Sequence, residues 1–401
     1  MVLGSLLLIG LAVPALPVTS YLGVLGLFAW PARNSPAERV EAVPLPHFTF
    51  VVPAHNEAAG IERTISSLRG VEYPTNRYSI LVVADNCADD TASLAERAGA
   101  RVLVRNDTIS RGKGFALKFA FDLLIAEGVT DGVVVVDADS DVSPNILFAF
   151  ASSIAKGVQA LQAHYGIRNA TESWRTRLMH IAFTLYHGVR SSARERLQLS
   201  TGLRGNGMCF TLDTLRQVPY CAFSLVEDVE YGVELGLHGV RVAYVGSATV
   251  LGEMVSGSAA SESQRKRWEQ GRGALVRRYA PQLLRRAIIG RDALLLDLAF
   301  DLLTPPLTRV LLFTVGGGAV ALTAVVAGVA QPYALIPWAI SAAGLASYLA
   351  RGVQLSSQGP RVLLDLVHAP KYILWKIGLK IGRRDPSTNE WVRTRRKGEG
   401  A

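Results

Sequence analysis

Apolar residues gather at the two ends of the chain, whereas the middle alternates between apolar and polar segments. Residues 1–30 contain no charged side chain, and two further apolar runs cover Leu307–Val329 and Leu335–Leu349. A helix needs about 20 apolar residues to cross a bilayer, and the last run reaches that length if Pro332–Ala334 joins it. We therefore predict one membrane helix in residues 1–30 and two in residues 306–351.

The middle of the chain, residues 47–285, follows a predicted linker at residues 31–46 and alternates strand-like and helix-like patterns. Strands are predicted at residues 48–53, 80–84, 101–104 and 133–136, with helices between them at residues 58–68, 90–98 and 115–126. This order is typical of an α/β fold with a doubly wound, largely parallel sheet. The run Val133–Val136 shows no alternation, which indicates a central strand buried on both faces.

The pattern is less regular beyond the central strand. It predicts a long basic and apolar helical stretch at residues 172–198, a glycine-rich segment at 202–210 that ends in a strand, a helix at 226–237, strands at 240–245 and 248–251, and a charged helix at 261–279.

Two segments next to the predicted membrane helices combine apolar and charged residues. In Ala293–Leu303 the side chains of Asp297 and Asp301 are four residues apart, which gives a helix a polar edge. Val362–Ile381 mixes Trp375 with several lysines. Such helices lie in the membrane interface, so we expect one within residues 286–305 and another, followed by a basic tail, within residues 352–401.

Basic residues mark one side of the predicted membrane helices. Arg33 and Arg39 follow the first helix, and Arg351 follows the last. Because basic loops stay in the cytosol, the domain at residues 47–285 is expected there and Gln331 outside. Much of the net charge of +9 lies in the C-terminal tail, where neighbouring apolar helices favour an anionic lipid surface over nucleic acid. Three cysteines without CxxC spacing indicate reduced thiols.

Two carboxylates, Asp137 and Asp139, directly follow the central valine strand. Ligands of open α/β sheets bind at the carboxyl ends of the strands, and carboxylate oxygens suit Mg²⁺ or Mn²⁺ shared with a substrate phosphate. The alternative is an acidic loop that only caps the next helix. An EF-hand is excluded because Val142 and Phe148 stand at the loop positions that require Gly and Glu.

Further polar residues follow other strands or open a helix. Glu57 and Asp85 follow the first two strands, and Lys113, between two glycines, opens a helix whose backbone N–H groups can bind an anion. This segment is not a Walker A loop, because Asp107 stands where the first glycine is required. Taken singly, Glu57 and Asp85 are better explained as helix caps, and the alternative for Lys113 is a solvated surface charge.

Two more motifs lie downstream, Glu227-Asp228 and Gln264-x-x-Arg267-Trp268. Together with the upstream acids and Lys113 they fit transfer of a sugar from a nucleotide diphosphate. A metal ion and cations take up the charge of the leaving group, a carboxylate base deprotonates the acceptor hydroxyl, and an aromatic ring packs on a sugar. Trp268 alone is equally well explained by core packing.

In this order, over roughly residues 47–280, the motifs resemble the membrane-bound, inverting family-2 glycosyltransferases, the group of the cellulose, hyaluronan and chitin-oligosaccharide synthases. The resemblance implies a GT-A fold. It implies that the catalytic base is Asp228, that the metal is held by Asp139 and Asp137, that the nucleotide-sugar contacts Glu57, Asp85, Lys113, Asp137, Gln264 and Arg267, and that the acceptor contacts Trp268, Asn206 and Glu227. Val226 departs from the family pattern, which usually has Thr there, and three predicted spans are fewer than the large polymerases have.

The resulting expectation is an inverting hexosyltransferase that uses Mg²⁺ or Mn²⁺ and a nucleotide-sugar, with UDP as the first choice. Its acceptor is expected to be a membrane-associated saccharide or a lipid-linked one, in exopolysaccharide or glycolipid synthesis. The expected location is the inner (plasma) membrane of a bacterium, with export or polysaccharide-assembly proteins as candidate partners. The alternatives are a GDP-sugar donor, a processive β-polysaccharide synthase acting as an oligomer or with an export partner, and an inactive membrane scaffold.

Overall fold

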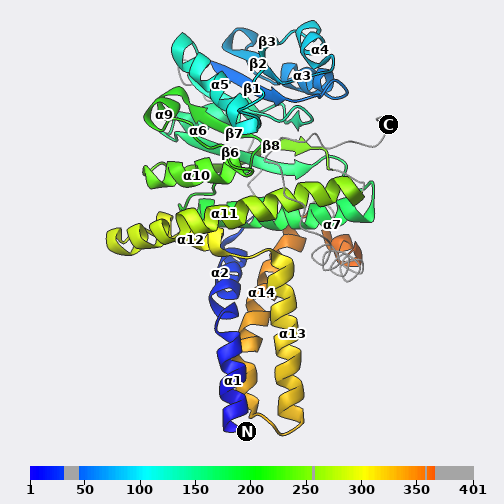
Figure 1. The fold of residues 1–401 in the computed structure, drawn as a ribbon, viewed down its shortest axis with the longest axis vertical. Helices are drawn as coiled ribbons and strands as arrows, with labels where there is room; N and C mark the ends of the chain where they lie inside the picture. The colour runs from blue at the N-terminus through cyan, green and yellow to red at the C-terminus, as the bar shows by residue number, and fades with distance from the viewer. Residues whose placement is uncertain (31–44, 255–257, 357–358, 366–401) are drawn as a thin grey trace.

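The computed structural model describes residues 1–30, 45–254, 258–356 and 359–365, with the backbone alone at residues 258–269. An α/β domain stands on a layer of helices, and a stem of apolar helices projects from the other side of that layer (Figure 1). The predicted linker and the predicted interfacial helix and tail after residue 365 lie almost entirely outside the described residues.

An eight-stranded sheet with the strand order β3-β2-β1-β4-β7-β6-β8-β5 forms the centre of the α/β domain. One half of it consists of β1 (Phe48–Ala54), β2 (Tyr78–Asp85), β3 (Arg101–Arg105) and β4 (Gly132–Val135). These strands are parallel to one another, as the sequence pattern predicts. The other half consists of β5 (Asp141–Val142), β6 (Ala160–Ile167), β7 (Met208–Thr211) and β8 (Val242–Gly252).

The second half makes the sheet mixed, so the prediction of a largely parallel sheet needs correction. Strand β7 runs antiparallel to its neighbours β4 and β6, and β5 runs antiparallel to β8. Because of this reversal, the amino end of β7 lies at the same edge of the sheet as the carboxyl ends of β1, β2 and β4. The glycine-rich loop at residues 202–207 is thereby delivered to the edge at which a ligand is expected.

Helices cover both faces of the sheet. One face packs against α3 (Ile61–Arg69), α4 (Thr91–Arg97) and α6 (Ile146–Ile154), and the other against α5 (Lys113–Glu127), α9 (Leu212–Gln217) and α10 (Glu227–Leu237). Val134 and Val136 belong to the first core and Val133 and Val135 to the second, all with no exposed surface. This confirms the prediction of a central strand buried on both faces, where each valine contributes about 1.5–3 kcal/mol.

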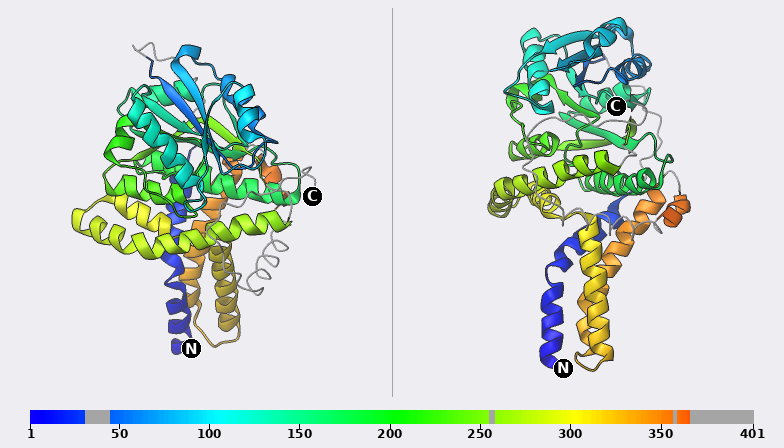
Figure 2. Two further views of the ribbon diagram at one scale, coloured as in Figure 1. Left: turned by 45° about the horizontal axis from the view of Figure 1, so that its top comes forward. Right: turned by 45° about the vertical axis from the view of Figure 1, so that its right-hand side comes forward.

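A layer of long helices separates the α/β domain from the stem. It contains α7 (Trp174–Phe183), a π-helical turn at Thr184–Val189, α8 (Arg190–Arg196), α11 (Ser258–Gly290) and α12 (Ala293–Leu303). Figure 2 shows α11 running across the top of the stem. Helices α10, α11 and α12 share a core around Leu283, Leu298 and Leu302. The layer therefore ties the α/β domain to the stem.

The stem consists of α1 (Val2–Ala12), α2 (Ala15–Phe28), α13 (Leu307–Val326) and α14 (Ile336–Leu355). The predicted single helix in residues 1–30 is two helices that meet at an angle of 50° beside Pro14, which lacks a backbone N–H. The segments Leu307–Val326 and Pro332–Leu355 are long and apolar enough to cross a membrane, and the bent pair is a third candidate if it acts as one span.

Helices α2 and α14 pack with their backbones in contact. A Cβ atom placed on Gly23 would lie 2.9 Å from the Cα of Gly344, and one on Gly26 would lie 2.8 Å from the Cα of Tyr348. Small residues permit such close approach between membrane helices, where dispersion rather than the hydrophobic effect holds helices together. Larger side chains at Gly23 or Gly26 would therefore force this pair of helices apart.

Helix α12 has the predicted bounds, but its polar edge does not face water. Asp297 is 5% exposed and Asp301 is 8% exposed, and both form ion pairs with arginines of α8. The apolar side of α12 packs against α10 and α11 instead of lying freely in a membrane interface. The reason is tertiary: the buried arginines supply the countercharges that the local sequence does not reveal.

Candidate functional site

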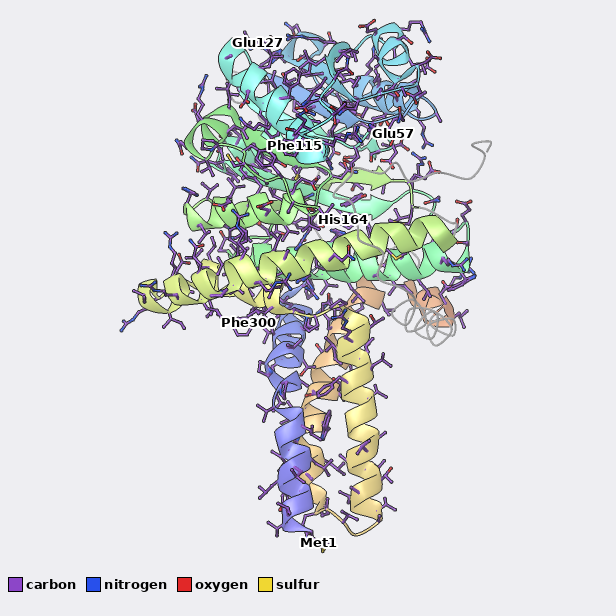
Figure 3. All side chains as sticks on the ribbon, viewed as in Figure 1. Met1, Glu57, Phe115, Glu127, His164 and Phe300 are labelled. Atoms are coloured by element: carbon purple, nitrogen blue, oxygen red, sulfur yellow. The ribbon has the colours of Figure 1, made fainter. Side chains whose placement is uncertain are left out.

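The predicted polar residues meet at the edge of the sheet next to the layer of long helices. Glu57 follows β1, Asp85 ends β2, and Asp137 and Asp139 follow β4. Figure 3 labels Glu57, after β1, and Phe115, in the first turn of α5, at a similar height in the α/β domain. The parallel arrangement of β1, β2 and β4 brings these groups to one edge.

Lys113 lies at the centre of the cluster. Its Nζ is 2.5 Å from Asp137 Oδ1 and 3.7 Å from Glu227 Oε1, and it donates to the carbonyl of Gly205 at 2.6 Å. The residue before it, Gly112, has φ of 134°, a conformation that side chains rarely adopt. Lys113 therefore joins the strand β4, the loop before β7 and the start of α10.

Asn206 fixes the loop that carries both aspartates. Its Oδ1 accepts a hydrogen bond from the Asp137 backbone N–H at 3.1 Å, and its Nδ2 donates to Ser140 Oγ at 2.7 Å. Ser140 Oγ in turn donates to Asp139 Oδ1 at 3.1 Å. Asn206 has no exposed surface, and both ends of its amide contact protein groups. This geometry supports a positioning role in place of the expected direct contact with the acceptor.

Glu227 and Asp228 open helix α10 beside Lys113. Burial raises the pKa of Glu227 to about 7, with Lys113 opposing the shift. Burial also raises the pKa of Asp228, against the backbone N–H of Val229 and the charge of Lys113. A Cβ placed on Gly205 would lie 3.2 Å from Asp228 Oδ2, so the loop passes close to this carboxylate. A carboxylate with a raised pKa is the better proton acceptor for general base catalysis.

Asp85 and Glu57 occupy the same edge but contact another set of groups. Asp85 is 1% exposed and pairs with Arg105 Nη1 at 2.6 Å. Burial raises the pKa of Asp85, and the hydrogen bond from Arg105 lowers it. The backbone N–H of Glu57 donates to Thr91 Oγ1 at 2.8 Å. Asp85 is thus held by Arg105, and the backbone at Glu57 is held by Thr91.

Gln264, Arg267 and Trp268 lie on the first half of α11, where the structure describes the backbone alone. The helix runs along the layer between the α/β domain and the stem (Figure 1). The side-chain contacts predicted for these three residues thus fall outside the described part, and their roles remain predictions.

A divalent metal ion fits the two aspartates if it is shared with a substrate. Within the described ranges, three or more His, Cys, Asp or Glu side chains do not converge into a complete metal site. Mg²⁺ is usually held by one or two carboxylates plus substrate phosphates. Asp139 and Asp137 follow one strand at the right place to supply those carboxylates, so the donor set suits an ion that enters with a diphosphate.

The structure adds residues that the sequence does not single out. Burial, followed by the charges of Asp137 and Asp139, raises the pKa of Tyr165 on β6. Arg168 Nη1 donates to the backbone carbonyl of Asp139 at 3.1 Å. Gln162 Nε2 donates to the carbonyl of Asn206 at 2.7 Å. Gln162 and Tyr165 lie on β6 and Arg168 directly follows it, and this strand is absent from the predicted strands.

Comparisons with known proteins agree with this geometry. The family model described as "Glycosyltransferase like family 2" matches residues 46–271. A probable glycosyltransferase, YdaM, of Bacillus subtilis is 22% identical over 68% of this chain and 65% of its own length. The beta-monoglucosyldiacylglycerol synthase of Synechocystis sp. is 28% identical over 57% of this chain and 48% of its own length. The chain thus spans about half to two thirds of the length of these relatives.

Among solved structures, a mannosyltransferase from Pyrobaculum calidifontis in complex with GDP-Man and Mn²⁺ aligns with a TM-score of 0.51 at 18% identity. The alignment covers 85% of this chain and 99% of that one, so the two share a fold. The narrower likeness to cellulose, hyaluronan and chitin-oligosaccharide synthases stays a prediction. Since the family model matches more than half of the 401 residues, this chain belongs to glycosyltransferase-like family 2.

Proposed function

We propose that the protein is an inverting hexosyltransferase that moves a sugar from a nucleotide diphosphate to an acceptor at the membrane surface. The observation that carries the proposal is the cluster of Lys113, Asp137, Glu227 and Asp228 at the catalytic edge of the sheet. In this cluster Lys113 can bind a diphosphate, Asp137 can bind a metal ion, and Asp228 can act as a general base. An inactive scaffold has no need of this arrangement.

Asp228 is proposed to accept the proton of the acceptor hydroxyl. In an inverting displacement, a base removes the proton of the acceptor hydroxyl while its oxygen attacks the anomeric carbon from the side opposite the leaving diphosphate. Asp228 sits at the start of α10, half-buried and with a raised pKa. Glu227, beside it, is proposed to position the loop and share the charge of Lys113.

The leaving nucleotide is proposed to lie between Lys113, the aspartates and the start of α5. Asp139, with Asp137 alongside, would hold Mg²⁺ or Mn²⁺. A bound divalent ion stabilises the charge that develops on the departing diphosphate. Lys113 and the backbone N–H groups at the start of α5 support the same charge. Asp85 and Glu57 are proposed to face the nucleoside, and Gln264 and Arg267 to close over the diphosphate.

The donor is proposed to be a UDP-sugar, with a GDP-sugar as the alternative. The alternative has a specific basis, because the mannosyltransferase of similar fold was solved with GDP-Man. The acceptor is proposed to be membrane-associated, and a lipid acceptor is favoured. The Synechocystis relative is named as a glycolipid synthase, and the α/β domain here stands on the helical layer at the top of the stem (Figure 1).

Short products are proposed rather than a polymer exported by one chain. A saccharide channel through a membrane needs polar groups along its wall. The groove between α13 and α14 has a volume of about 470 Å³, and its lining consists of apolar residues together with Thr314 and Trp338. Helices α2 and α14 are in backbone contact and leave no channel between Gly23 and Gly344. A polymer would require an oligomer or an export partner.

The test uses full-length protein in nanodiscs that contain diacylglycerol. With Mn²⁺ and either UDP-glucose or GDP-mannose, we expect release of the nucleotide diphosphate and a glycolipid that carries one or a few sugars in the β-configuration. Product size and anomeric configuration are measured by mass spectrometry and NMR. Absence of transfer from both donors would contradict the proposed activity, and long acceptor-independent chains would contradict the proposed product.

A further inference from the structure

A cluster of buried charged side chains lies where the α/β domain, the helical layer and the stem meet. We call it the junction network, and its members are Arg190, Arg194, Arg204, Asp297 and Asp301. None of them is more than 8% exposed. Charges removed from water are strongly disfavoured unless each is paired. The five side chains therefore hold one another in a fixed arrangement.

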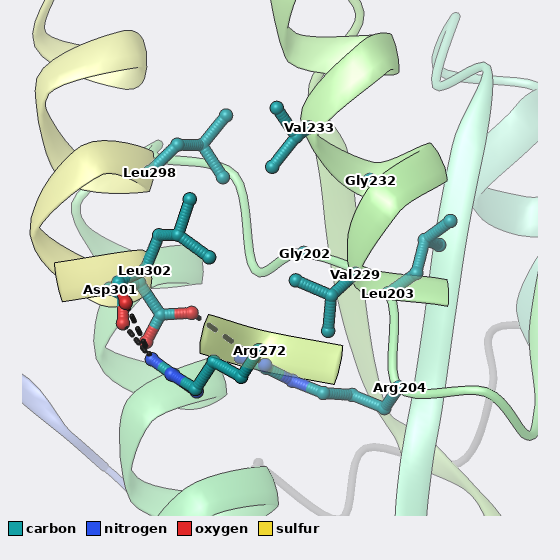
Figure 4. A pocket seen from close by; sticks show the side chains of 10 residues that line it. All are labelled: Gly202, Leu203, Arg204, Val229, Gly232, Val233, Arg272, Leu298, Asp301 and Leu302. Carbon is teal, nitrogen blue, oxygen red and sulfur yellow. Dashed lines mark hydrogen bonds and ion pairs between the residues drawn. The ribbon is translucent and has the colours of Figure 1, made fainter. Parts of the chain in front are cut away.

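Asp301 is the carboxylate on which the junction network converges. Its Oδ1 accepts a hydrogen bond from Arg190 at 2.9 Å and pairs with Arg194 at 3.1 Å. Its Oδ2 lies 3.7 Å from Arg204 Nη1, and its backbone carbonyl accepts a hydrogen bond from Arg272 of α11 (Figure 4). Burial alone would raise the pKa of Asp301, but the arginines lower it well below its ordinary value, which keeps the carboxylate charged.

Two tyrosines of the stem orient the arginines of the network. Tyr348 on α14 accepts a hydrogen bond from Arg190 Nε at 3.1 Å. Tyr21 on α2 accepts one from Arg194 Nη2 at 2.5 Å and donates one to Asp297 Oδ1 at 2.8 Å. The positions of Arg190 and Arg194 therefore depend on both stem helices, which belong to opposite ends of the chain.

On the other side, Arg204 belongs to the loop that shapes the transfer site. Its guanidinium lies 4.2 Å from the centre of the Tyr186 ring, and its Nη2 donates to the carbonyl of Thr201 at 2.7 Å. The next residue, Gly205, accepts the hydrogen bond from Lys113, and its neighbour Asn206 holds the backbone of the Asp-x-Asp loop. A displacement of Arg204 would therefore move the carbonyl of Gly205 and disturb its hydrogen bond with Lys113.

We propose that Asp301 is a positioning residue that couples the stem to the transfer site through Arg204. The same carboxylate holds the loop at residues 202–207 and binds the arginines that the stem tyrosines orient. The stem then contributes to the geometry of the reaction in addition to holding the protein at the membrane. This inference rests on the proposed glycosyltransferase function and adds a residue to it.

Asp297 supplies a matched comparison within the same helix. It lies one turn before Asp301, is similarly buried, and also pairs with Arg194, at 3.0 Å. Its described partners are Arg194 and Tyr21, whereas Arg204 contacts Asp301. If the network only fastened α12 to α8, loss of either carboxylate would have the same consequence. If Asp301 positions the loop, only its loss changes catalysis.

The experiment uses the full chain in nanodiscs. Binding is measured with UDP and Mn²⁺. Turnover is measured with diacylglycerol as the acceptor and UDP-glucose as the donor, or with GDP-mannose if the wild type requires it. We expect Asp301→Asn and Asp297→Asn both to lower the melting temperature. Only Asp301→Asn should lower kcat, by about 10²-fold, the scale of a misplacement of about 1 Å, with wild-type nucleotide affinity and donor KM. Equal kcat values for the two variants would overturn the inference.

A double-mutant cycle tests the path through Arg204. Arg204→Lys keeps the charge but removes the guanidinium fork, and we expect it to lower kcat as Asp301→Asn does. In the Asp301→Asn background it should change kcat by less than about twofold, whereas in the Asp297→Asn background its full effect should persist. If Asp301→Asn and Arg204→Lys each lower kcat independently of the other, the inference would be overturned.

Two further outcomes are also decisive. If Asp301→Asn does not fold, Arg204→Lys alone carries the test, and a wild-type kcat in that variant would overturn the inference. A wild-type protein that binds the nucleotide but transfers sugar from neither donor would overturn the proposed function, and this inference with it. If the wild type is active and the effects of Asp301→Asn and Arg204→Lys on kcat are additive, this inference alone would be overturned.

Discussion

Lys113 Nζ lies 2.5 Å from Asp137 Oδ1, which places a cation against the first carboxylate of the Asp-x-Asp motif. Lys113 begins α5 and Asp137 follows β4, so this contact joins two elements that flank the proposed nucleotide-sugar site. Burial disfavours the ammonium ion, yet Asp137, Glu227 and Asp228 raise the pKa of Lys113 above its ordinary value. The side chain therefore stays charged at physiological pH and separates carboxylates that would otherwise repel one another.

Replacement of this cation should weaken donor binding. We expect Lys113→Met to reduce the affinity for UDP by about 10–100-fold, because a hydrogen bond to a charged group contributes about 1.5–3 kcal/mol. Isothermal titration with UDP and Mn²⁺ measures the change. Lys118→Met is the control, since Lys118 lies on the same helix and forms an exposed ion pair with Asp122. Equal UDP affinity in the two variants would argue against the placement of the diphosphate.

Metal dependence should disappear with the second carboxylate of the motif. Asp139→Asn keeps the shape of the side chain and removes the charge that would hold the ion. We expect the fold to persist while Mn²⁺ no longer increases the affinity for UDP. Asp141→Asn serves as the comparison, because the carboxylate of Asp141 already pairs with Arg63 and Arg168. Undiminished Mn²⁺-dependent binding in Asp139→Asn would remove this residue from the metal site.

Loss of the proposed base should affect turnover and spare binding. Asp228→Asn is expected to lower kcat by about 10²–10⁴-fold, the usual contribution of a general base, with UDP affinity close to that of the wild type. Steady-state kinetics and titration separate the two effects. Glu234→Gln, further along α10 and hydrogen-bonded to Tyr279, should leave kcat unchanged. Weak donor binding with normal turnover at saturation would contradict the assignment of Asp228.

Stability should fall in mild acid because of a buried histidine. Burial lowers the pKa of His164 to about 4, and its Nδ1 lies 2.8 Å from the hydroxyl of Tyr244. Since the unfolded chain binds the proton more readily, its pKa being about 6.5, stability is complete above that pH and declines as the pH falls towards 4. The expected loss between pH 7 and pH 5 is about 2 kcal/mol.

Melting curves at the two pH values measure this loss, and His164→Gln should make it smaller. The control is His238→Gln, because His238 is exposed and bonded to a carbonyl of its own helix. An unchanged pH dependence in His164→Gln would show that other groups govern the acid response.

The membrane orientation can be tested by thiol labelling in intact cells. The proposed topology places the α/β domain in the cytosol and the connection between α13 and α14 outside. An impermeant maleimide should therefore label Gln331→Cys from outside, while the exposed Cys221 of the α/β domain should react only after permeabilisation. Labelling of Cys221 in intact wild-type cells would reverse the proposed orientation.

Local pattern was sufficient to predict the first half of the fold. The unbroken valines of β4 and the strand–helix alternation before it gave the parallel strands and placed Asp85, Asp137 and Asp139 at one edge. Strand β6 was missed because Ala160, Ala163 and Gly166 are weak strand formers. Tyr165 on this strand, whose pKa responds to the charges of Asp137 and Asp139, was missed with it.

Charges paired over long distances explain the remaining differences. Asp297 and Asp301 look like the water-facing edge of an interfacial helix, because their partners Arg190 and Arg194 stand about 100 positions earlier. Asn206 lies in the predicted glycine-rich segment, but only the fold shows that its side-chain amide is hydrogen-bonded to Ser140 and to the backbone of Asp137. Sequence patterns identify which groups carry the chemistry, whereas the supporting contacts depend on tertiary structure.

The backbone contact between Gly23 and Gly344 sets an order for biosynthesis. These residues are 321 positions apart (344 − 23), so a ribosome that adds about 5–20 residues per second needs roughly 15–65 s to deliver the second helix after the first. During that interval the glycine face of α2 has no partner from this chain, while the whole α/β domain is already available to fold. Assembly of the stem, and of the buried charges above it, is therefore a late event. A chain released before α14 is complete carries an assembled sheet on an unfinished stem.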